Sequence, residues 1–160
     1  LDTNDAALER TLYGNVVAPL RLVRRVLPAM LARGGGQIIN VSSGAGKNDP
    51  PAPANRGGWG FAYGGSKAAL ARMSGCVNRE HGAQGIRAFS VNPGVVATGA
   101  LTATLGEGGE LERRYGAMKP AEIGAALLWL ATDPRAAALA TRTVMLDLQD
   151  LVREYALKGA

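Results

Sequence analysis

A tyrosine and a lysine stand four positions apart in the stretch AYGGSK, where two glycines and a serine separate Tyr63 from Lys67. In a helix, residues i and i+4 lie on one face, so the lysine ammonium can sit close to the phenol oxygen. A tyrosine hydroxyl exchanges protons readily at neutral pH only when a nearby cation stabilises its phenolate. The pair therefore has the composition of a general acid or base with its activating cation. The small residues between them would let a large ligand approach the backbone.

A serine and a Pro-Gly turn follow two predicted strands at the points where those strands end. Ser43 comes after the apolar run IINVS, and its hydroxyl could donate a hydrogen bond to a carbonyl oxygen held against the tyrosine. Asn92-Pro93-Gly94 ends the second run, and Asp147 ends the third. Ligands of open parallel sheets bind beyond the carboxyl ends of the strands. We therefore expect these residues and Tyr63 to surround one crevice.

The elements that must position these residues alternate along the chain. Apolar positions recur every three or four residues over 5–31, which predicts one long amphipathic helix that Pro19 kinks and that ends near Pro28. Further helices are predicted at 63–82, with Ala68, Leu70, Met73 and Val77 as apolar points, at 120–132, at 148–159, and in a short piece around 110–115.

Three short apolar runs predict strands at 38–42, 86–92 and 143–147, the first buried on both faces. The stretch 44–60 is rich in proline and glycine and is predicted to be a long loop without regular structure. Alternating helices and strands indicate an α/β domain with right-handed parallel crossovers.

Length and composition favour one soluble domain spanning residues 1–160, of which 47% are hydrophobic. A single cysteine gives neither an internal disulfide nor a zinc site, so we expect a reducing cytoplasm and no metal. No apolar run reaches the roughly 18 residues of a membrane span. The net charge of +5 suggests nucleic acid as a partner, but the basic residues are scattered among acidic ones, which argues against it.

The chain resembles the C-terminal part of a short-chain dehydrogenase/reductase. NVVAPLRLVRRVLPAM is similar to the family's long helix, IINVSS to its fifth strand with a serine, YGGSK to its Tyr-x-x-x-Lys and VNPGVVAT to its Pro-Gly-x-x-x-Thr. These motifs come in the family's order and span residues 5 to about 147. The resemblance implies an α/β fold, namely the C-terminal part of a doubly wound Rossmann-type parallel sheet with three strands and flanking helices.

The resemblance also implies a reaction, in which a secondary alcohol and a ketone are interconverted by hydride transfer with NAD or NADP. Tyr63 would be the general acid or base, Lys67 would favour its phenolate and bind the nicotinamide ribose, and Ser43 would orient the carbonyl. Asn15 would hold a water that extends a proton relay. The residues expected to line the nicotinamide are Pro93, Gly94, Val96 and Thr98. Family members usually assemble as homodimers or homotetramers through their long helices.

The chain departs from the family pattern in ways that leave a second interpretation open. It contains no Gly-x-x-x-Gly-x-Gly turn or Asn-Asn-Ala-Gly and opens with Leu1, so we expect a truncated chain that lacks the N-terminal strands. The alternative function is therefore a non-catalytic fragment that retains mainly the dimerisation helices. The gap between Ser43 and Tyr63 is also longer than usual, so 44–60 is expected to be an insertion on the substrate side. Within it, Trp59 either walls a substrate pocket or packs the loop, and the same two options apply to the adjoining Phe61.

Overall fold

The computed structural model describes residues 4–99, 115–141 and 144–155. Its centre is a parallel sheet in the order β1-β2-β3, formed by β1 (Gly36–Val41), β2 (Ile86–Asn92) and β3 (Leu146–Asp147). β1 pairs with β2 from Gly36 opposite Ile86 to Val41 opposite Val91. β2 pairs with β3 only through Val91 with Leu146 and Asn92 with Asp147. The predicted three-stranded parallel sheet with flanking helices is confirmed.

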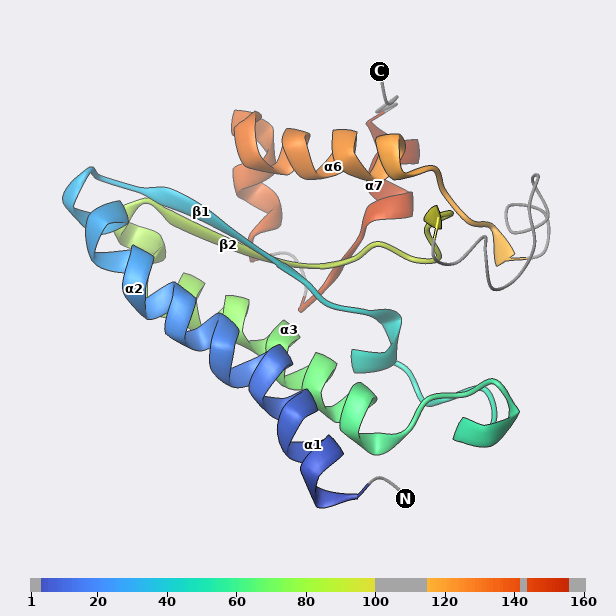
Figure 1. Ribbon diagram of the computed structural model, residues 1–160. Helices are drawn as coiled ribbons and strands as arrows, with labels where there is room; N and C mark the ends of the chain where they lie inside the picture. Colours follow the sequence, from blue (N-terminus) through green and yellow to red (C-terminus); the bar gives the residue numbers. More distant parts are fainter. Residues whose placement is uncertain (1–3, 100–114, 142–143, 156–160) are drawn as a thin grey trace.

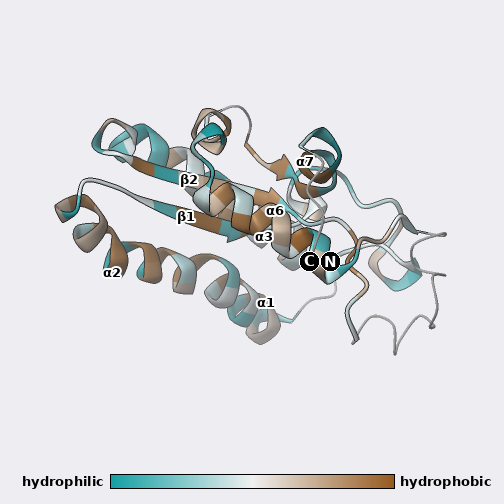
Figure 2. Ribbon diagram, turned by 90° about the horizontal axis from the view of Figure 1, so that it is seen from above, coloured by the Kyte–Doolittle hydropathy of each residue, from teal (hydrophilic) through white to brown (hydrophobic). Residues whose placement is uncertain are grey.

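Helices cover both faces of the sheet (Figure 1). On one face lie α1 (Asp5–Leu12), α2 (Ala18–Ala32) and α3 (Phe61–His81), and on the other lie α6 (Pro120–Thr132) and α7 (Leu148–Glu154). Hydrophobic residues lie along the strands and along α2 in Figure 2. No helix in the described part of the chain is long and apolar enough to cross a membrane.

The predicted long helix at 5–31 is an almost continuous rod in which a π-turn, Tyr13–Val17, joins α1 to α2. Asn4 caps its start by accepting a hydrogen bond from the Ala7 N–H at 2.9 Å. Proline has no N–H, so Pro19 cannot donate to the carbonyl of Asn15, four residues earlier. In the turn before Pro19, the Ala18 N–H donates to the carbonyl of Tyr13, five residues back. The break in α-helical geometry expected at Pro19 therefore lies in the preceding turn, Tyr13–Val17, which contains Asn15.

α3 is fixed to the sheet by apolar packing and by buried polar side chains. Val77 packs with Ile86 and Ala88 of β2. Buried Ser74 accepts hydrogen bonds from Asn40 Nδ2 at 3.0 Å and from Ser90 Oγ at 2.8 Å. Every one of these polar atoms has a partner, so the helix has a defined position over the strands.

The opposite face holds the larger apolar core. Phe89 and Val91 of β2 pack there with Leu130 of α6 and Leu148 of α7. α6 begins at Pro120, and the Glu122 carboxylate accepts a hydrogen bond from the Lys119 N–H at 2.9 Å. After α6 the chain forms a 3₁₀ segment, η5 (Pro134–Leu139), before it reaches β3.

Several predictions differ from the structure in detail. The first strand is not buried on both faces, because β1 is an edge strand in the described sheet and Val41 is 46% exposed. The loop 44–60 contains two short 3₁₀ turns, at Gly44–Gly46 and Ala54–Arg56. The third strand is shorter than predicted, and Ala68, expected to be an apolar contact point, is exposed. The short helix expected around 110–115 lies, apart from Tyr115, outside the described residues.

Candidate active site

Tyr63 and Lys67 lie in the first two turns of α3, beside the end of β1. Lys67 Nζ donates a hydrogen bond to the carbonyl oxygen of Val41 at 3.1 Å and lies 5.9 Å from the centre of the Tyr63 ring. The tyrosine side chain is 42% exposed, and its hydroxyl has no hydrogen-bond partner among the described residues. The last residue of β1 thus holds the ammonium near an accessible phenol.

The two serines after β1 have different surroundings. Ser42 is buried and donates a hydrogen bond to the Lys67 carbonyl at 2.8 Å, so it ties the strand end to α3. Ser43 is only partly buried and caps the turn Gly44–Gly46, where its Oγ accepts from the Ala45 N–H at 3.2 Å. Ser43 therefore keeps its O–H free to turn toward a ligand, whereas the Ser42 hydroxyl donates to the protein.

The glycines between the tyrosine and the lysine make room for the protein itself. A Cβ on Gly64 would lie 3.1 Å from the Ala45 carbonyl oxygen and 3.2 Å from the Trp59 ring. A Cβ on Gly65 would lie 3.4 Å from the Phe61 ring. The nearest neighbours of these glycines in the structure are thus the turn after β1 and two aromatic rings.

Trp59 and Phe61 lie against the glycines of α3 and also line a cavity. They border a cavity of about 480 Å³ with Pro50 and Pro53 of the loop 44–60, and Gly64 and Gly65 form its α3 side. Tyr63 does not line this cavity, because successive helix residues point about 100° apart. The cavity therefore lies beside Tyr63 and Lys67 and not directly over the phenol.

Asn15 is joined to α3 by its side chain. Its Nδ2 donates a hydrogen bond to Ser66 Oγ at 3.0 Å, and Ser66 Oγ donates to the carbonyl of Tyr63 at 2.9 Å. The amide of Asn15 is thus engaged one residue from Lys67. In a regular α-helix, residue 19 would donate its N–H to the carbonyl of Asn15. Pro19 has no N–H, so this hydrogen bond cannot form.

Asn92 connects the ends of all three strands and was not singled out as a site residue by the sequence. Its Oδ1 accepts from the N–H groups of Gly44, at 3.0 Å, and Gly94, at 3.1 Å. Its Nδ2 donates to Asp147 Oδ1 at 2.6 Å, and Asp147 Oδ2 lies 3.5 Å from Lys47 Nζ. The sequence signal that could have identified Asn92 is its polar side chain at the carboxyl end of a predicted strand, where ligands of parallel sheets bind.

The Pro-Gly segment leaves β2 in a fixed path. Gly94 has a φ of +69°, and a Cβ there would lie 2.5 Å from Gln149 Nε2, so only glycine fits. Val96 forms a parallel bridge with Met118, and the Ala97 N–H donates to the Met118 carbonyl at 2.9 Å. Pro93 and Val96 are partly buried, whereas Gly94 and Thr98 are exposed.

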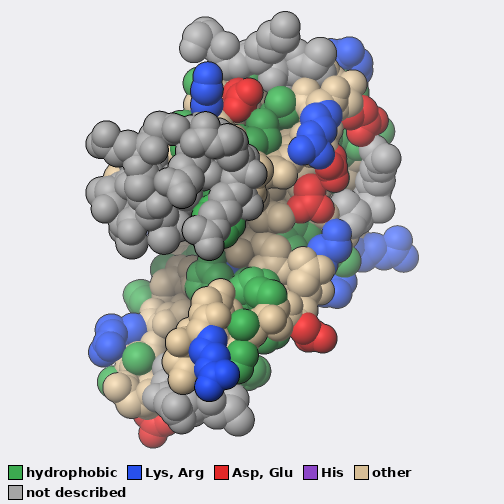
Figure 3. Space-filling model, turned by 90° about the vertical axis from the view of Figure 1, so that its right-hand side faces the viewer, with side chains coloured by type: hydrophobic (Ala, Val, Ile, Leu, Met, Phe, Trp, Pro, Cys, Tyr) green, Lys and Arg blue, Asp and Glu red, His purple; other side chains and the backbone are tan. Residues whose placement is uncertain are grey.

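The turn carrying Ser43, Lys67 and the Pro-Gly segment therefore lie at the carboxyl ends of the strands, and a crevice surrounded by them and Tyr63 stays a prediction. The side of the molecule to which the strands run faces the viewer in Figure 3, where basic and acidic side chains are interspersed. No group of three or more His, Cys, Asp or Glu that could hold a metal occurs within 4–99, 115–141 and 144–155.

Comparison with known proteins agrees with this geometry. Residues 1–107 match the family described as short chain dehydrogenase. The chain is 33% identical over 137 residues to a fatty acyl-CoA reductase of Mycobacterium tuberculosis, covering 80% of this chain and 39% of that protein. It is 39% identical over 103 residues to 2-keto-3-deoxy-L-fuconate dehydrogenase of Xanthomonas campestris, covering 63% of this chain and 32% of that one.

Solved structures show the same fold. The angucycline C-6 ketoreductase LanV with bound NADP superposes with a TM-score of 0.71 at 28% identity, over 92% of this chain and 54% of that one. The 4-hydroxyisoleucine dehydrogenase complexed with NADH gives 0.67 at 25% identity, over 91% and 60%. The chain thus spans about half the length of these structures, and 32% and 39% of the two curated relatives. By sequence and fold, this chain belongs to the short-chain dehydrogenase family.

Proposed function

We propose that this chain carries the catalytic residues of an NAD(P)-dependent oxidoreductase that interconverts a secondary alcohol and a ketone. One observation carries the proposal: the ammonium of Lys67 is held by the last carbonyl of β1 beside the accessible phenol of Tyr63. An exposed tyrosine whose ring lies near a fixed cation suits proton exchange with a substrate oxygen. The two curated relatives are a reductase and a dehydrogenase, which supports the same class of reaction.

In this proposal Tyr63 moves the proton. Its phenolate takes the proton of an alcohol, and its neutral form returns a proton to a carbonyl oxygen. Lys67 has three donors, of which Val41 uses one, so two can serve ribose hydroxyls. Ser43 orients the substrate oxygen through its hydroxyl.

Asn15 acts in this proposal through its main chain. Its Nδ2 is bonded to Ser66, and the group proposed to hold a water near Lys67 is its main-chain carbonyl oxygen. Pro19 supplies the reason that this carbonyl is available, because it removes the N–H that would occupy the oxygen in an α-helix. A water there would connect Lys67 with solvent and let protons leave the site.

The residues after β2 fit the nicotinamide end of the cofactor, which supplies or accepts the hydride when it is bound. Gly94 offers exposed backbone without a side chain at the carboxyl end of the central strand. Pro93, Gly94, Val96 and Thr98 would line the nicotinamide, and Tyr63 with Lys67 would meet its ribose. NADP in LanV and NADH in 4-hydroxyisoleucine dehydrogenase make NAD or NADP the expected cofactor.

The test is turnover by the protein expressed from its complete reading frame. Tyr63→Phe should lower turnover by about a hundredfold or more and leave cofactor affinity nearly unchanged, because it removes only the exchanging hydroxyl. Lys67→Met should damage both turnover and cofactor affinity, because the ammonium is proposed to meet the ribose beside the tyrosine. Tyr13→Phe is the matched control, since Tyr13 is exposed on the rod. Near-normal turnover in Tyr63→Phe would overturn the assignment.

A second candidate is a non-catalytic piece that assembles through its helices as a homodimer or homotetramer. It is favoured by apolar side chains of the rod that face solvent, which include Leu12, Leu22 and Val26. Complete absence of turnover from the full reading frame, with cofactor, would support this candidate over the enzyme.

A further inference from the structure

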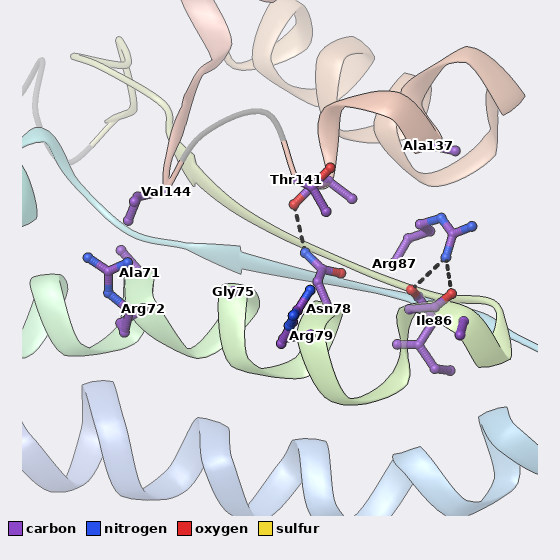
Figure 4. A pocket seen from close by; sticks show the side chains of 13 residues that line it. Ala71, Arg72, Gly75, Asn78, Arg79, Ile86, Arg87, Ala137, Thr141 and Val144 are labelled. Atoms are coloured by element: carbon purple, nitrogen blue, oxygen red, sulfur yellow. Dashed lines mark hydrogen bonds between the residues drawn. The ribbon is translucent and has the colours of Figure 1, made fainter.

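A second cavity lies at the end of the sheet opposite the candidate active site. It has a volume of about 730 Å³ and is lined by the C-terminal half of α3, the start of β2, and residues of η5 together with Ala140, Thr141 and Val144 (Figure 4). Ile86, the first residue of β2, lines it, whereas the catalytic pair lies where the strands end. We name it the α3–η5 pocket. Its size lies in the range of small-ligand sites, about 300–1,000 Å³.

Three arginines line the α3–η5 pocket, and no Asp or Glu is among its lining residues. Arg72 and Arg79 are exposed, and neither guanidinium has an ion-pair or hydrogen-bond partner within the described structure. Arg87 donates from one terminal nitrogen to the carbonyls of Gly82, at 2.7 Å, and Ile86, at 2.9 Å. Its other N–H groups remain available. The pocket therefore presents positive charge without internal neutralisation.

The helix backbone is open between the two free arginines. Gly75 lies on the pocket side of α3, and a Cβ there would meet no atom within 4 Å. Glycine destabilises a helix interior relative to alanine, and nothing packed inside this chain requires it here. A glycine at this position gives a ligand access to the helix surface between Arg72 and Arg79.

The floor of the pocket is apolar and its width is fixed. Ala71, Ile86 and Ala140 are buried and line it. Buried Asn78 donates to the carbonyls of Ala88 and Ala140, each at 2.7 Å, and accepts from the Ala88 N–H at 2.7 Å. One side chain thus ties α3 to β2 and to the segment after η5, so the pocket is held open in one shape.

We propose that the α3–η5 pocket binds a small organic anion, a phosphate or carboxylate on an apolar body of nucleotide size, as a second ligand. The planar guanidinium groups match phosphate and carboxylate oxygens, and the small apolar floor accepts the body. Arg72 and Arg79 are two helical turns apart, about 10 Å along the axis, so two anionic groups can be held at once. The site uses no catalytic residue and does not depend on the proposed reaction.

The experiment titrates the protein with AMP, with the apolar dicarboxylate sebacate, and with inorganic phosphate and adenosine as the separated parts. We expect saturable binding of AMP or sebacate at millimolar concentration or below, and much weaker binding of phosphate or adenosine alone. Calorimetry gives the affinity, and NMR shifts of the arginine Nε–H groups locate the ligand. AMP without sebacate would identify a phosphate ligand, and the reverse would identify a carboxylate.

Three variants separate a built pocket from diffuse positive charge. R72A/R79A should weaken binding at least about tenfold, because two charge-assisted contacts are lost. Gly75→Leu keeps every charge but fills the pocket, and should also weaken binding about tenfold. R24A/R25A, which removes two exposed arginines from α2, should change affinity by less than about twofold.

Several results would overturn the proposal. These are no saturable binding of either probe, equal weakening by R24A/R25A and R72A/R79A, or unchanged affinity in Gly75→Leu. Circular dichroism of each variant shows whether it is folded. If Gly75→Leu unfolds, Ala137→Leu, at an exposed position across the pocket, replaces it.

Discussion

The Asn92 side chain makes the hydrogen bonds that connect the strand ends around the candidate active site. Its amide satisfies two backbone N–H groups and one carboxylate oxygen, which belong to the Ser43 turn, the Pro-Gly segment and β3. Each partner is drawn from a different strand end. A side chain that serves three groups cannot be replaced without leaving them unpaired or rehydrated.

Asn92→Ala should lower the free energy of unfolding by roughly 1–3 kcal/mol, because partly buried polar groups lose their partners. In NMR spectra the amides of Gly44 and Gly94 should shift and exchange faster with solvent. Asn48→Ala is the matched control, since exposed Asn48 makes one hydrogen bond to Gly44, at 3.2 Å. Unchanged Gly44 and Gly94 amides in Asn92→Ala would contradict this role.

Asn92→Asp tests the same network through charge. A carboxylate there would face Asp147 across the present 2.6 Å contact, so two like charges would repel. This variant should be less stable than Asn92→Ala at neutral pH and should regain stability when the medium is acidified, as measured by urea unfolding.

At the scale of elements, the junction between α6 and η5 depends on a charged pair. Asp133 ends α6 and caps η5, and its carboxylate accepts from Arg135 Nε at 2.9 Å and from a terminal nitrogen at 2.7 Å. The Arg135 guanidinium lies 5.7 Å from the Trp129 ring and 6.0 Å from the Tyr155 ring, which stack at 4.3 Å. The pair therefore helps to hold the C-terminal helix against α6.

The hydrogen bonds from the Arg135 side chain lower the pKa of Asp133 from 3.8 to about 2. A carboxyl whose pKa is lower in the folded state stabilises the fold above its ordinary pKa. That contribution should be lost as pH falls from about 4 toward 2. Thermal unfolding across this range should show the loss in the wild type and its absence in Asp133→Asn. Arg135→Ala should also remove it, and a persistent loss in both variants would contradict the assignment.

Elements with strong local signals were predictable from the sequence. α6 occupies the predicted range 120–132, and β2 occupies 86–92, because prolines mark the start of one and follow the end of the other. The π-turn was not predicted, since Pro19 was expected to act where it stands and not on the preceding turn. The exposure of Val41 was missed because burial of a strand depends on its neighbours in the sheet.

The candidate site was predictable as a set of motifs but not as a network. Tyr63 and Lys67 were predicted from their spacing of four residues, and Ser43 from its place at the end of a predicted strand. Asn92 bonds to Gly44 and Asp147, which are 48 and 55 residues away, so no local pattern identifies those contacts. The packing role of Gly64 and Gly65 also depends on residues brought in by the long loop.

At the scale of the whole molecule, two surfaces favour association. The rod exposes large apolar side chains, which are Leu12, Tyr13, Val17, Leu22 and Val26. β1 is an edge strand within the described sheet, and Val41 at its end is 46% exposed. Contiguous apolar surface and an open strand edge are both common sites of self-association.

We therefore expect the protein to self-associate, and L22E/V26E to shift it toward the monomer, as measured by light scattering over a range of concentrations. Burying a carboxylate at an apolar interface is unfavourable, which gives the direction of the shift. Leu128→Glu is the matched control, because Leu128 is 64% exposed on α6, on the other side of the sheet. A wild-type monomer at high concentration would contradict the expectation.

The uneven pairing of the sheet has a consequence for the order in which the molecule opens. β1 and β2 share six residue pairs and are clasped by α3, whereas β3 joins β2 through two. Local unfolding follows the weakest joints, so we expect the β2–β3 backbone pairing to open at a lower free energy than the β1–β2 pairing, while the apolar core keeps α6 and α7 packed on β2. Native-state fluctuations would thus release the Asp147 side of the site first, while Tyr63 and Lys67 stay anchored in the slower-exchanging half.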